Sequence, residues 1–152
     1  MSKKRILLVE DEKHLADTIK LNLEIEDYHT ILVYDGSSAI STFREQRFDL
    51  VILDIMIPNI DGIAVCENIR LHDKNLPIMF LSARSSAEDR VLGLKKGADD
   101  YMTKPFNIEE LMLRINNLIR RKEKSNEKSF NVNDGKFPKP KCLWTMGQRL
   151  GR

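Results

Sequence analysis

Acidic, hydroxyl and amino side chains stand at the ends of several short apolar runs in this chain, where they could carry out chemistry together. They are Glu10, Asp11, Asp54, Ser82 and Lys104. Three neighbouring carboxylates repel one another, and a divalent cation reverses that repulsion. Because these ligands are hard oxygens with no cysteine or histidine among them, they favour Mg²⁺. An ammonium and a hydroxyl beside such a cluster are typical of phosphoryl transfer to a carboxylate.

Taken singly, each of these side chains also has a simpler interpretation. Acids at the start of a helix, a helix cap, a loop hydroxyl and a surface lysine are all common. Tyr101 is likewise a typical core aromatic. The functional hypothesis therefore depends on whether the fold brings the five side chains to one edge.

The run Leu50–Leu53 explains how they can meet. Four apolar residues without a polar interruption are typical of a strand buried on both faces of a parallel sheet. Pro58 cannot donate to a sheet ladder, so the strand is expected to end before it. Asp54 then stands at the carboxyl end of a central strand, the edge at which open α/β sheets bind ligands. It would serve there as a ligand to something positive or as a nucleophile.

Strand and helix patterns alternate along the chain. Apolar or β-branched runs predict strands at 5–9, 28–33, 50–53, 78–81 and 101–103. Helical spacing predicts a helix after each strand, the third running through Val65, Ile69 and Leu71 and the last ending near Arg121. Capping-box spacings at Ser85–Glu88 and Asn107–Glu110 open the last two helices, and Gly97 closes the fourth. This order predicts an α/β fold, with a parallel sheet covered by helices on both faces.

Composition indicates a cytoplasmic protein with an acidic body and a basic tail. Apolar residues make up 41% of the 152 residues, enough for one domain with its own core. Residues 1–119 carry 15 basic and 20 acidic side chains, whereas residues 120–152 carry 10 and 3. Cys66 and Cys142 do not make a disulfide framework. No apolar run approaches the roughly 20 residues of a transmembrane helix, and none near the start is long enough for a secretory signal.

Five motifs, in order and spacing, resemble the receiver domain of two-component response regulators. They are Leu8–Glu12, Leu53–Pro58 with Asp61-Gly62, Leu81–Arg84, Gly97–Tyr101 and Lys104–Phe106. The resemblance covers the chain to about Arg121, so we expect residues 1–121 to form this domain. It implies a flavodoxin-like, doubly wound parallel sheet with the strand order 2-1-3-4-5. It also implies a signalling module that catalyses only its own phosphorylation and dephosphorylation.

The resemblance assigns a role to each residue of the predicted site. Asp54 would accept a phosphoryl group from a sensor histidine kinase. Glu10, Asp11 and Asp54 would hold Mg²⁺, with the backbone carbonyl of Met56 as a further ligand. Lys104 would contact the phosphoryl group, with its bond to the following proline in cis.

The resemblance also implies how phosphorylation is reported. Ser82 would turn toward the new phosphoryl oxygens and Tyr101 would follow it inward, which changes the surface of the fourth helix, fifth strand and fifth helix. The sequence of the last third of this region is similar to that of the winged-helix, OmpR-type subfamily. In that subfamily this surface forms a homodimer after phosphorylation, and Asp99, Asp100 and Arg114 match its charged residues. Such exposed ion pairs serve partner choice more than affinity.

The tail departs from that subfamily, which continues with a DNA-binding domain. From Lys122 the composition becomes polar and basic. Phe130–Phe137 resembles the opening hairpin of such a domain, but Pro138–Arg152 does not continue it. We expect residues 122–152 to be a linker and a truncated or aberrant remnant, largely disordered. The chain would then be a truncated or frame-shifted product, or an isolated receiver, and DNA binding would belong to a longer parent protein.

Three alternatives fit parts of the pattern less well. A Mg²⁺-dependent phosphatase with an aspartyl nucleophile carries a second acid two residues later, where this chain has Met56. A flavin-binding electron carrier needs a hydroxyl- and glycine-rich phosphate loop, whereas Glu10–Glu12 repel phosphate. The basic tail could bind nucleic acid weakly through counterion release, although charge runs of this kind are commonly solvated linkers.

Overall fold

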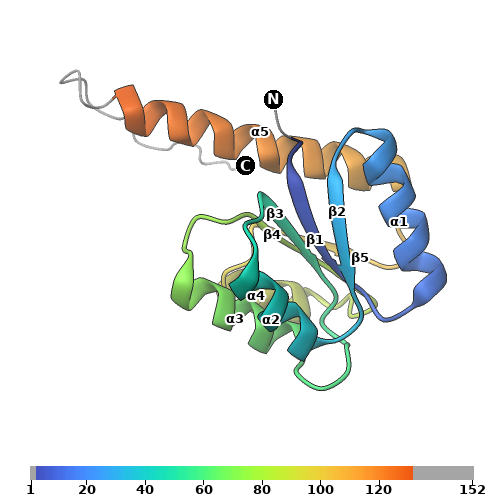
Figure 1. Ribbon diagram of the computed structural model, residues 1–152. Coiled ribbons are helices and arrows are strands. Elements are labelled where there is room, and N and C mark those ends of the chain that lie inside the picture. Colours follow the sequence, from blue (N-terminus) through green and yellow to red (C-terminus); the bar gives the residue numbers. More distant parts are fainter. Residues whose placement is uncertain (1–2, 132–152) are drawn as a thin grey trace. The chain divides into compact units, whose positions relative to one another are not determined.

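The chain folds into strands and helices that alternate around one parallel sheet (Figure 1). The computed structural model describes the backbone of residues 3–131 and the side chains of residues 3–125. In chain order the elements are β1 (Arg5–Val9), α1 (Lys13–Ile25), β2 (His29–Val33), α2 (Gly36–Glu45), β3 (Leu50–Leu53), α3 (Gly62–His72), β4 (Ile78–Ser82), α4 (Ala87–Lys95), β5 (Asp100–Thr103) and α5 (Ile108–Asn131).

The strand order confirms the expected α/β fold. Neighbouring strands are all parallel, and the sheet runs β2-β1-β3-β4-β5. Val9 of β1 lies opposite both Val33 of β2 and Leu53 of β3. Because β1 and β3 end level with each other, the residues that follow them, Glu10 and Asp54, come to the same edge of the sheet.

Helices cover both faces of the sheet, as the sequence predicts. Leu7 and Val9 of β1 pack in one apolar cluster with residues of α2 and α3, whereas Ile6 and Leu8 pack in a second cluster with residues of α1 and α5. Figure 1 shows these two pairs of helices on opposite sides of the strands. Every residue of β3 and β4 is buried, which explains the unbroken apolar runs Leu50–Leu53 and Ile78–Leu81.

Leu71 lies in α3, as predicted, but its side chain does not join the core. Its side chain is 80% exposed, whereas Val65 and Ile69 of the same helix are fully buried. Leu71 lies two residues beyond Ile69, which is about 200° around a helix. It therefore falls on the solvent side of α3.

Helix α4 starts at Ala87, as predicted, but a different serine caps it. Its N-cap is Ser86 and not Ser85. The Ser86 Oγ accepts a hydrogen bond from the Asp89 N–H (3.0 Å) and donates one to Asp89 Oδ2 (2.8 Å), so an aspartate replaces glutamate in the capping pair. The other expected caps are present. The Asn107 side chain accepts a hydrogen bond from the Glu110 N–H at 3.0 Å. Gly97 follows the end of α4 with φ +117°.

Helix α5 continues beyond the predicted end at Arg121 to Asn131. Half of the residues from Lys122 to Asn131 are Lys or Glu, which are good helix formers, and neither glycine nor proline occurs between Arg121 and Gly135. Phe130 and Asn131, which the sequence predicts to open a hairpin, are therefore helical, and the rest of that predicted hairpin lies outside the described residues. Nowhere in residues 3–131 does a helix combine the length and the apolar character that crossing a membrane requires.

Candidate functional site

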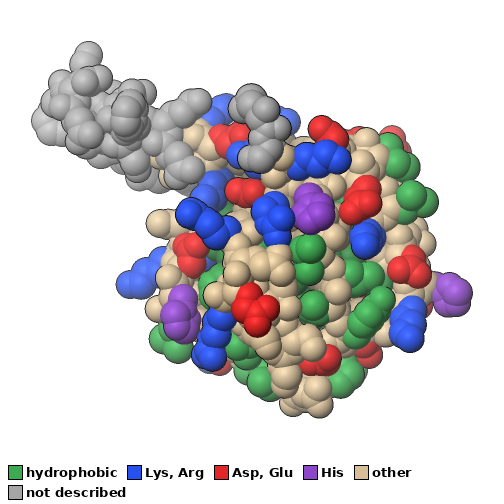
Figure 2. Space-filling view, viewed as in Figure 1, with side chains coloured by type: hydrophobic (Ala, Val, Ile, Leu, Met, Phe, Trp, Pro, Cys, Tyr) green, Lys and Arg blue, Asp and Glu red, His purple; other side chains and the backbone are tan. Residues whose placement is uncertain are grey.

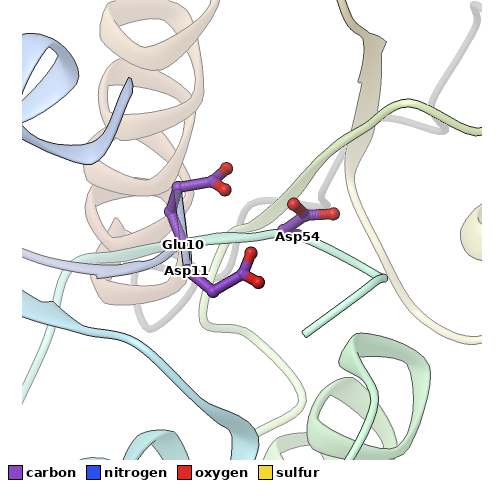
Figure 3. A group of neighbouring side chains, drawn as sticks. All are labelled: Glu10, Asp11 and Asp54. Atoms are coloured by element: carbon purple, nitrogen blue, oxygen red, sulfur yellow. The ribbon is translucent and has the colours of Figure 1, made fainter. Parts of the chain in front are cut away.

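Three carboxylates meet at the carboxyl edge of the sheet. Glu10 and Asp11 follow β1 and Asp54 follows β3, and Figure 3 shows their side chains turned toward a common space. One oxygen of each lies within 4.8 Å of the others. Backbone bonds hold the strand ends together, because Glu10 N–H donates to Val33 O and Asp54 N–H donates to Val9 O, each at 3.1 Å. The structure thus assembles the acidic cluster that the sequence predicts.

Lys104 reaches this cluster from the end of β5. Its Nζ lies 2.9 Å from Glu10 Oε1 and 2.9 Å from Asp54 Oδ2. The Lys104 N–H donates to Ser82 O at 2.8 Å, which holds the turn after β5 against β4, and the Lys104–Pro105 bond is cis. An ammonium between two buried carboxylates offsets much of their mutual repulsion.

Backbone N–H groups bind the other oxygens of the two buried carboxylates. Glu10 Oε2 accepts from Glu12 N–H at 3.1 Å, and Asp54 Oδ1 accepts from Met56 N–H at 3.0 Å. Glu10 and Asp54 therefore each have one oxygen on the ammonium and one on a backbone amide, which is how buried charges are commonly satisfied. The role of the Met56 carbonyl as a metal ligand stays a prediction.

Burial and pairing shift the pKa values of this site in a consistent way. Burial raises the pKa of Glu10, because it disfavours the carboxylate, and the hydrogen bond from Lys104 only partly offsets that effect. Burial also lowers the pKa of Lys104, but its bonds to Glu10 and Asp54 outweigh burial, so that its pKa is raised. The site therefore favours the charged form of Lys104, whereas burial makes the charged form of Glu10 less favourable.

We expect Glu10 to shape the dependence of stability on pH. Because its pKa is raised on folding, its contribution to the free energy of unfolding is fully present below the unfolded value near 4.5 and is lost as pH rises through the folded value. In metal-free buffer, Glu10→Gln should lose less stability than wild type over that pH range. Urea unfolding at a series of pH values measures this. Equal pH slopes for the two proteins would contradict the assignment.

The donor set of the acidic cluster fits Mg²⁺. Three carboxylates supply hard oxygens, and the cluster found among the described residues contains neither thiol nor imidazole. The cluster carries three negative charges when ionised and Lys104 returns one positive charge. A divalent cation would therefore meet favourable charge.

Ser82 and Tyr101 are joined through Arg84. Ser82 is fully buried at the end of β4, and its Oγ accepts a hydrogen bond from Arg84 N–H at 3.2 Å. The Tyr101 hydroxyl donates to Arg84 O at 2.8 Å, and its ring lies against Phe80 with 5.9 Å between the ring centroids. Tyr101 is 7% exposed, so it already occupies the inward position that the resemblance assigns to the phosphorylated state. Arg84 is not among the predicted site residues, because it contributes only backbone atoms and residue type does not reveal those.

The three residues expected on a dimer surface pair with basic or acidic side chains of their own chain. Asp100 Oδ1 lies 2.8 Å from an Arg114 guanidinium nitrogen on α5. Asp99 Oδ2 lies 3.1 Å from Arg70 on α3 and also accepts the Ile78 N–H at 2.9 Å. Asp99 therefore holds β4 and α3 together within one chain. Arg70 is not among the predicted site residues, since a lone arginine near a helix end is an ordinary surface pattern.

This chain belongs to the response regulator receiver domain family, whose model matches residues 6–116. Domains of this family are signalling domains that bind Mg²⁺ at an acidic pocket and interact with histidine kinases. The match agrees with the parallel sheet order and with the acidic cluster at its edge.

Relatives within the family are close in sequence and in structure. Response regulator ArlR of Staphylococcus saprophyticus is 44% identical over 122 residues, covering 80% of this chain and 55% of that protein. The alkaline phosphatase synthesis transcriptional regulatory protein PhoP of Bacillus subtilis is 40% identical over 131 residues, covering 86% and 55%. The receiver domain of Francisella response regulator 1452 matches with a TM-score of 0.75 and 37% identity, covering 78% of this chain and 98% of that one. The chain spans about half the length of the curated relatives it matches.

Proposed function

We propose that Asp54 is the phosphoacceptor of this receiver domain and that a sensor histidine kinase supplies the phosphoryl group. The observation that carries the proposal is the position of Lys104 Nζ, 2.9 Å from the Asp54 carboxylate at the carboxyl end of β3. Asp54 Oδ1 is held by Met56 N–H. A carboxylate held in this way is oriented for attack and faces an ammonium that can bind phosphoryl oxygens.

The chemical step needs no general base. An oxygen of the Asp54 carboxylate attacks the phosphorus of a phosphohistidine, and the phosphorus–nitrogen bond breaks with its electron pair going to the imidazole. An acyl phosphate forms on Asp54, and water later hydrolyses it. Lys104 would bind the phosphoryl oxygens, and the Ser82 hydroxyl would donate to them after leaving Arg84 N–H. Because the nucleophile attacks as an anion, it has no proton to lose.

Glu10, Asp11, Asp54 and the Met56 carbonyl are the residues that would hold Mg²⁺. When bound, the cation offsets negative charge on the phosphoryl oxygens during transfer. Lys104 would then give up its contact with Glu10 while keeping its place beside Asp54. The exchange leaves the buried Glu10 carboxylate paired throughout.

A groove beside the cluster supports docking of the donor protein there. It has a volume of about 470 Å³, and its lining includes Lys104 together with Leu15, Phe106 and Ile108. Lys104 therefore belongs to both the groove and the acidic cluster. A kinase surface could pack apolar side chains into the groove while it presents its phosphohistidine to Asp54.

We further propose that phosphorylation changes the surface formed by α4, β5 and α5 and favours a homodimer. The link would run from Ser82 through Arg84 to Tyr101, which the hydrogen bonds already connect. Asp99, Asp100 and Arg114 would take part in the dimer by exchanging partners between chains. In a longer parent protein, this dimer would control DNA binding.

Nucleic-acid binding by the body of the domain has less support. Figure 2 shows acidic and basic side chains interspersed over the face in view. Binding through counterion release requires positive charge gathered on one surface. The described part of the face seen in Figure 2 lacks such a surface.

Acetyl phosphate tests the phosphoacceptor directly. Incubation of the full chain with acetyl phosphate and Mg²⁺ should add one phosphoryl group by intact mass. Asp54→Asn, which keeps the size of the side chain and removes the anionic nucleophile, should add none. Chelation of Mg²⁺ should abolish labelling of the wild type.

Asp49→Asn is the matched control, since Asp49 precedes β3 and binds Arg5 N–H outside the acidic cluster. It should be labelled as wild type is. Sedimentation of the same samples should show dimer in labelled wild type and monomer in Asp54→Asn. Retained labelling of Asp54→Asn would refute the assignment.

A further inference from the structure

We propose that Gly93 of α4 is a positioning residue for Tyr101. Because glycine has no side chain, the inward tyrosine ring can pack directly against the helix at this position. The consequence for signalling rests on the proposed function, in which Tyr101 transmits the phosphorylated state. The packing itself does not depend on that function. The described hydrogen bonds do not link Gly93 to Tyr101.

Gly93 has no room for a side chain. A Cβ at this position would lie 2.8 Å from Tyr101 Cδ2, 3.0 Å from Tyr101 Cε2 and 3.1 Å from Phe80 Cδ2. Carbon atoms in ordinary contact are about 3.5–4.0 Å apart. Even the smallest side chain at position 93 would therefore collide with the Tyr101 ring, which lies against this face of α4.

Gly93 also lies where glycine is otherwise unfavourable. It is the buried residue of α4 and stands inside the helix, between Leu92 and Leu94. Glycine in a helix interior is less favourable than alanine, because it loses more backbone freedom on folding. Packing against Tyr101 supplies a physical reason for a residue that the helix itself disfavours.

The inward position of Tyr101 depends on three contacts. The ring lies beside Phe80, the hydroxyl donates to Arg84 O at 2.8 Å, and α4 approaches closely at Gly93. A methyl group at position 93 would occupy the space in which the Tyr101 ring packs against α4, and the ring would have to move away. Displacement of the ring lengthens or breaks the bond to Arg84, whose N–H binds Ser82 Oγ. A change in α4 is thus passed to the turn after β4.

A double-mutant cycle in urea tests the packing. Four proteins are compared: wild type, Gly93→Ala, Tyr101→Ala and the double variant. In the Tyr101→Ala background, where the ring is gone, Gly93→Ala should lower the unfolding constant roughly fivefold, the usual gain of alanine over glycine in a helix. With Tyr101 present, that gain should vanish or reverse. The same effect of Gly93→Ala in both backgrounds would overturn the proposal.

Fluorine NMR of protein labelled with 3-fluorotyrosine provides a readout that general destabilisation does not give. The chain has three tyrosines, and the Tyr101 resonance is the one missing from Tyr101→Ala. Its solvent isotope shift should be small in wild type and larger in Gly93→Ala. Lys95→Ala, an exposed substitution in the same helix, should leave it unchanged. An unchanged Tyr101 resonance in Gly93→Ala would also overturn the proposal.

Both measurements use unphosphorylated protein, so they are independent of the proposed function. After acetyl phosphate treatment, Gly93→Ala should form a smaller fraction of dimer than wild type. If wild type takes up no phosphoryl group, the proposed function fails while the cycle and the NMR shift still decide the role of Gly93. If labelled Gly93→Ala dimerises as wild type does, Gly93 has no part in the response.

Discussion

Replacing Lys104 by methionine is expected to slow phosphorylation of Asp54 by roughly 10²–10³-fold, the usual effect of removing one preorganised charge-stabilising donor. The Lys104 Nζ lies 2.9 Å from Asp54 Oδ2 and is placed by the backbone bond from Lys104 N–H to Ser82 O. Methionine keeps the length and much of the volume of lysine but carries no charge. The rate is measured by intact mass after mixing with acetyl phosphate at fixed Mg²⁺.

The same substitution should have a second effect, on stability. Without metal, Lys104→Met leaves two buried carboxylates near each other without their cation, and breaking a buried pair in this way typically costs about 3–5 kcal/mol in the free energy of unfolding. Only 18% of the Lys104 side chain is exposed, and its two partners are almost completely buried. Mg²⁺ should therefore stabilise Lys104→Met more than it stabilises wild type.

An exposed lysine provides the control for both effects. Lys95→Met changes a lysine on the surface of α4 and should alter neither the labelling rate nor the response of stability to Mg²⁺. If Lys104→Met matches wild type in labelling rate and in metal-free stability, then the ammonium does not act on Asp54 as proposed.

The position of the acidic cluster could be predicted because it follows from periodicity. Unbroken apolar runs identify buried parallel strands, and parallel strands share one carboxyl edge, so Glu10 and Asp54 had to come close. The register confirms this, since Val9 lies opposite Leu53. The approach of Lys104 from the end of β5 follows by the same reasoning.

The contacts that complete the site could not be predicted from residue types. Met56 N–H and Glu12 N–H bind the carboxylates through backbone atoms, and every residue except proline carries such a group. The backbone of Arg84 joins Ser82 to Tyr101 in the same way. These contacts depend on the path of the loops after each strand, which hydrophobic periodicity does not determine.

The errors at helix ends have a local origin. Ser85 and Ser86 both offer a hydroxyl before α4, and only the geometry of the turn selects Ser86. The extension of α5 past Arg121 was missed because a charged run resembles a linker in composition, although lysine and glutamate favour a helix. The first error concerns a cap and the second a boundary, and both lie at helix ends, which sequence patterns define least well.

Gly62→Ala is expected to reduce the free energy of unfolding by about 3 kcal/mol, at the upper end of the usual cost of overpacking. A Cβ at Gly62 would lie 2.2 Å from Asp54 O and 2.7 Å from Ile55 Cα. Both are backbone atoms, so a side-chain rotation cannot relieve the collision. The Gly62 N–H also donates to Ile55 O at 2.9 Å, which ties the start of α3 to the same segment.

This substitution should affect phosphorylation as well as stability, because the methyl group would collide with the backbone of Asp54, the proposed phosphoacceptor. To make room for the methyl group, either Asp54 O or the first turn of α3 must move, and the first of these shifts the carboxylate away from Lys104. We therefore expect slower labelling by acetyl phosphate even at temperatures where Gly62→Ala is fully folded. Urea unfolding and labelling rates are measured on the same preparation.

Ala64→Gly is the matched control, since it makes the opposite exchange in the first turn of the same helix. The Ala64 N–H donates a hydrogen bond to Asp61 Oδ1 at 2.9 Å, and a glycine at this position can make the same bond. It should lose only about 1 kcal/mol, the propensity difference between alanine and glycine, and should be labelled at the wild-type rate. If Gly62→Ala is as stable as wild type and is labelled as fast, the close packing of α3 on Asp54 does not position the phosphoacceptor.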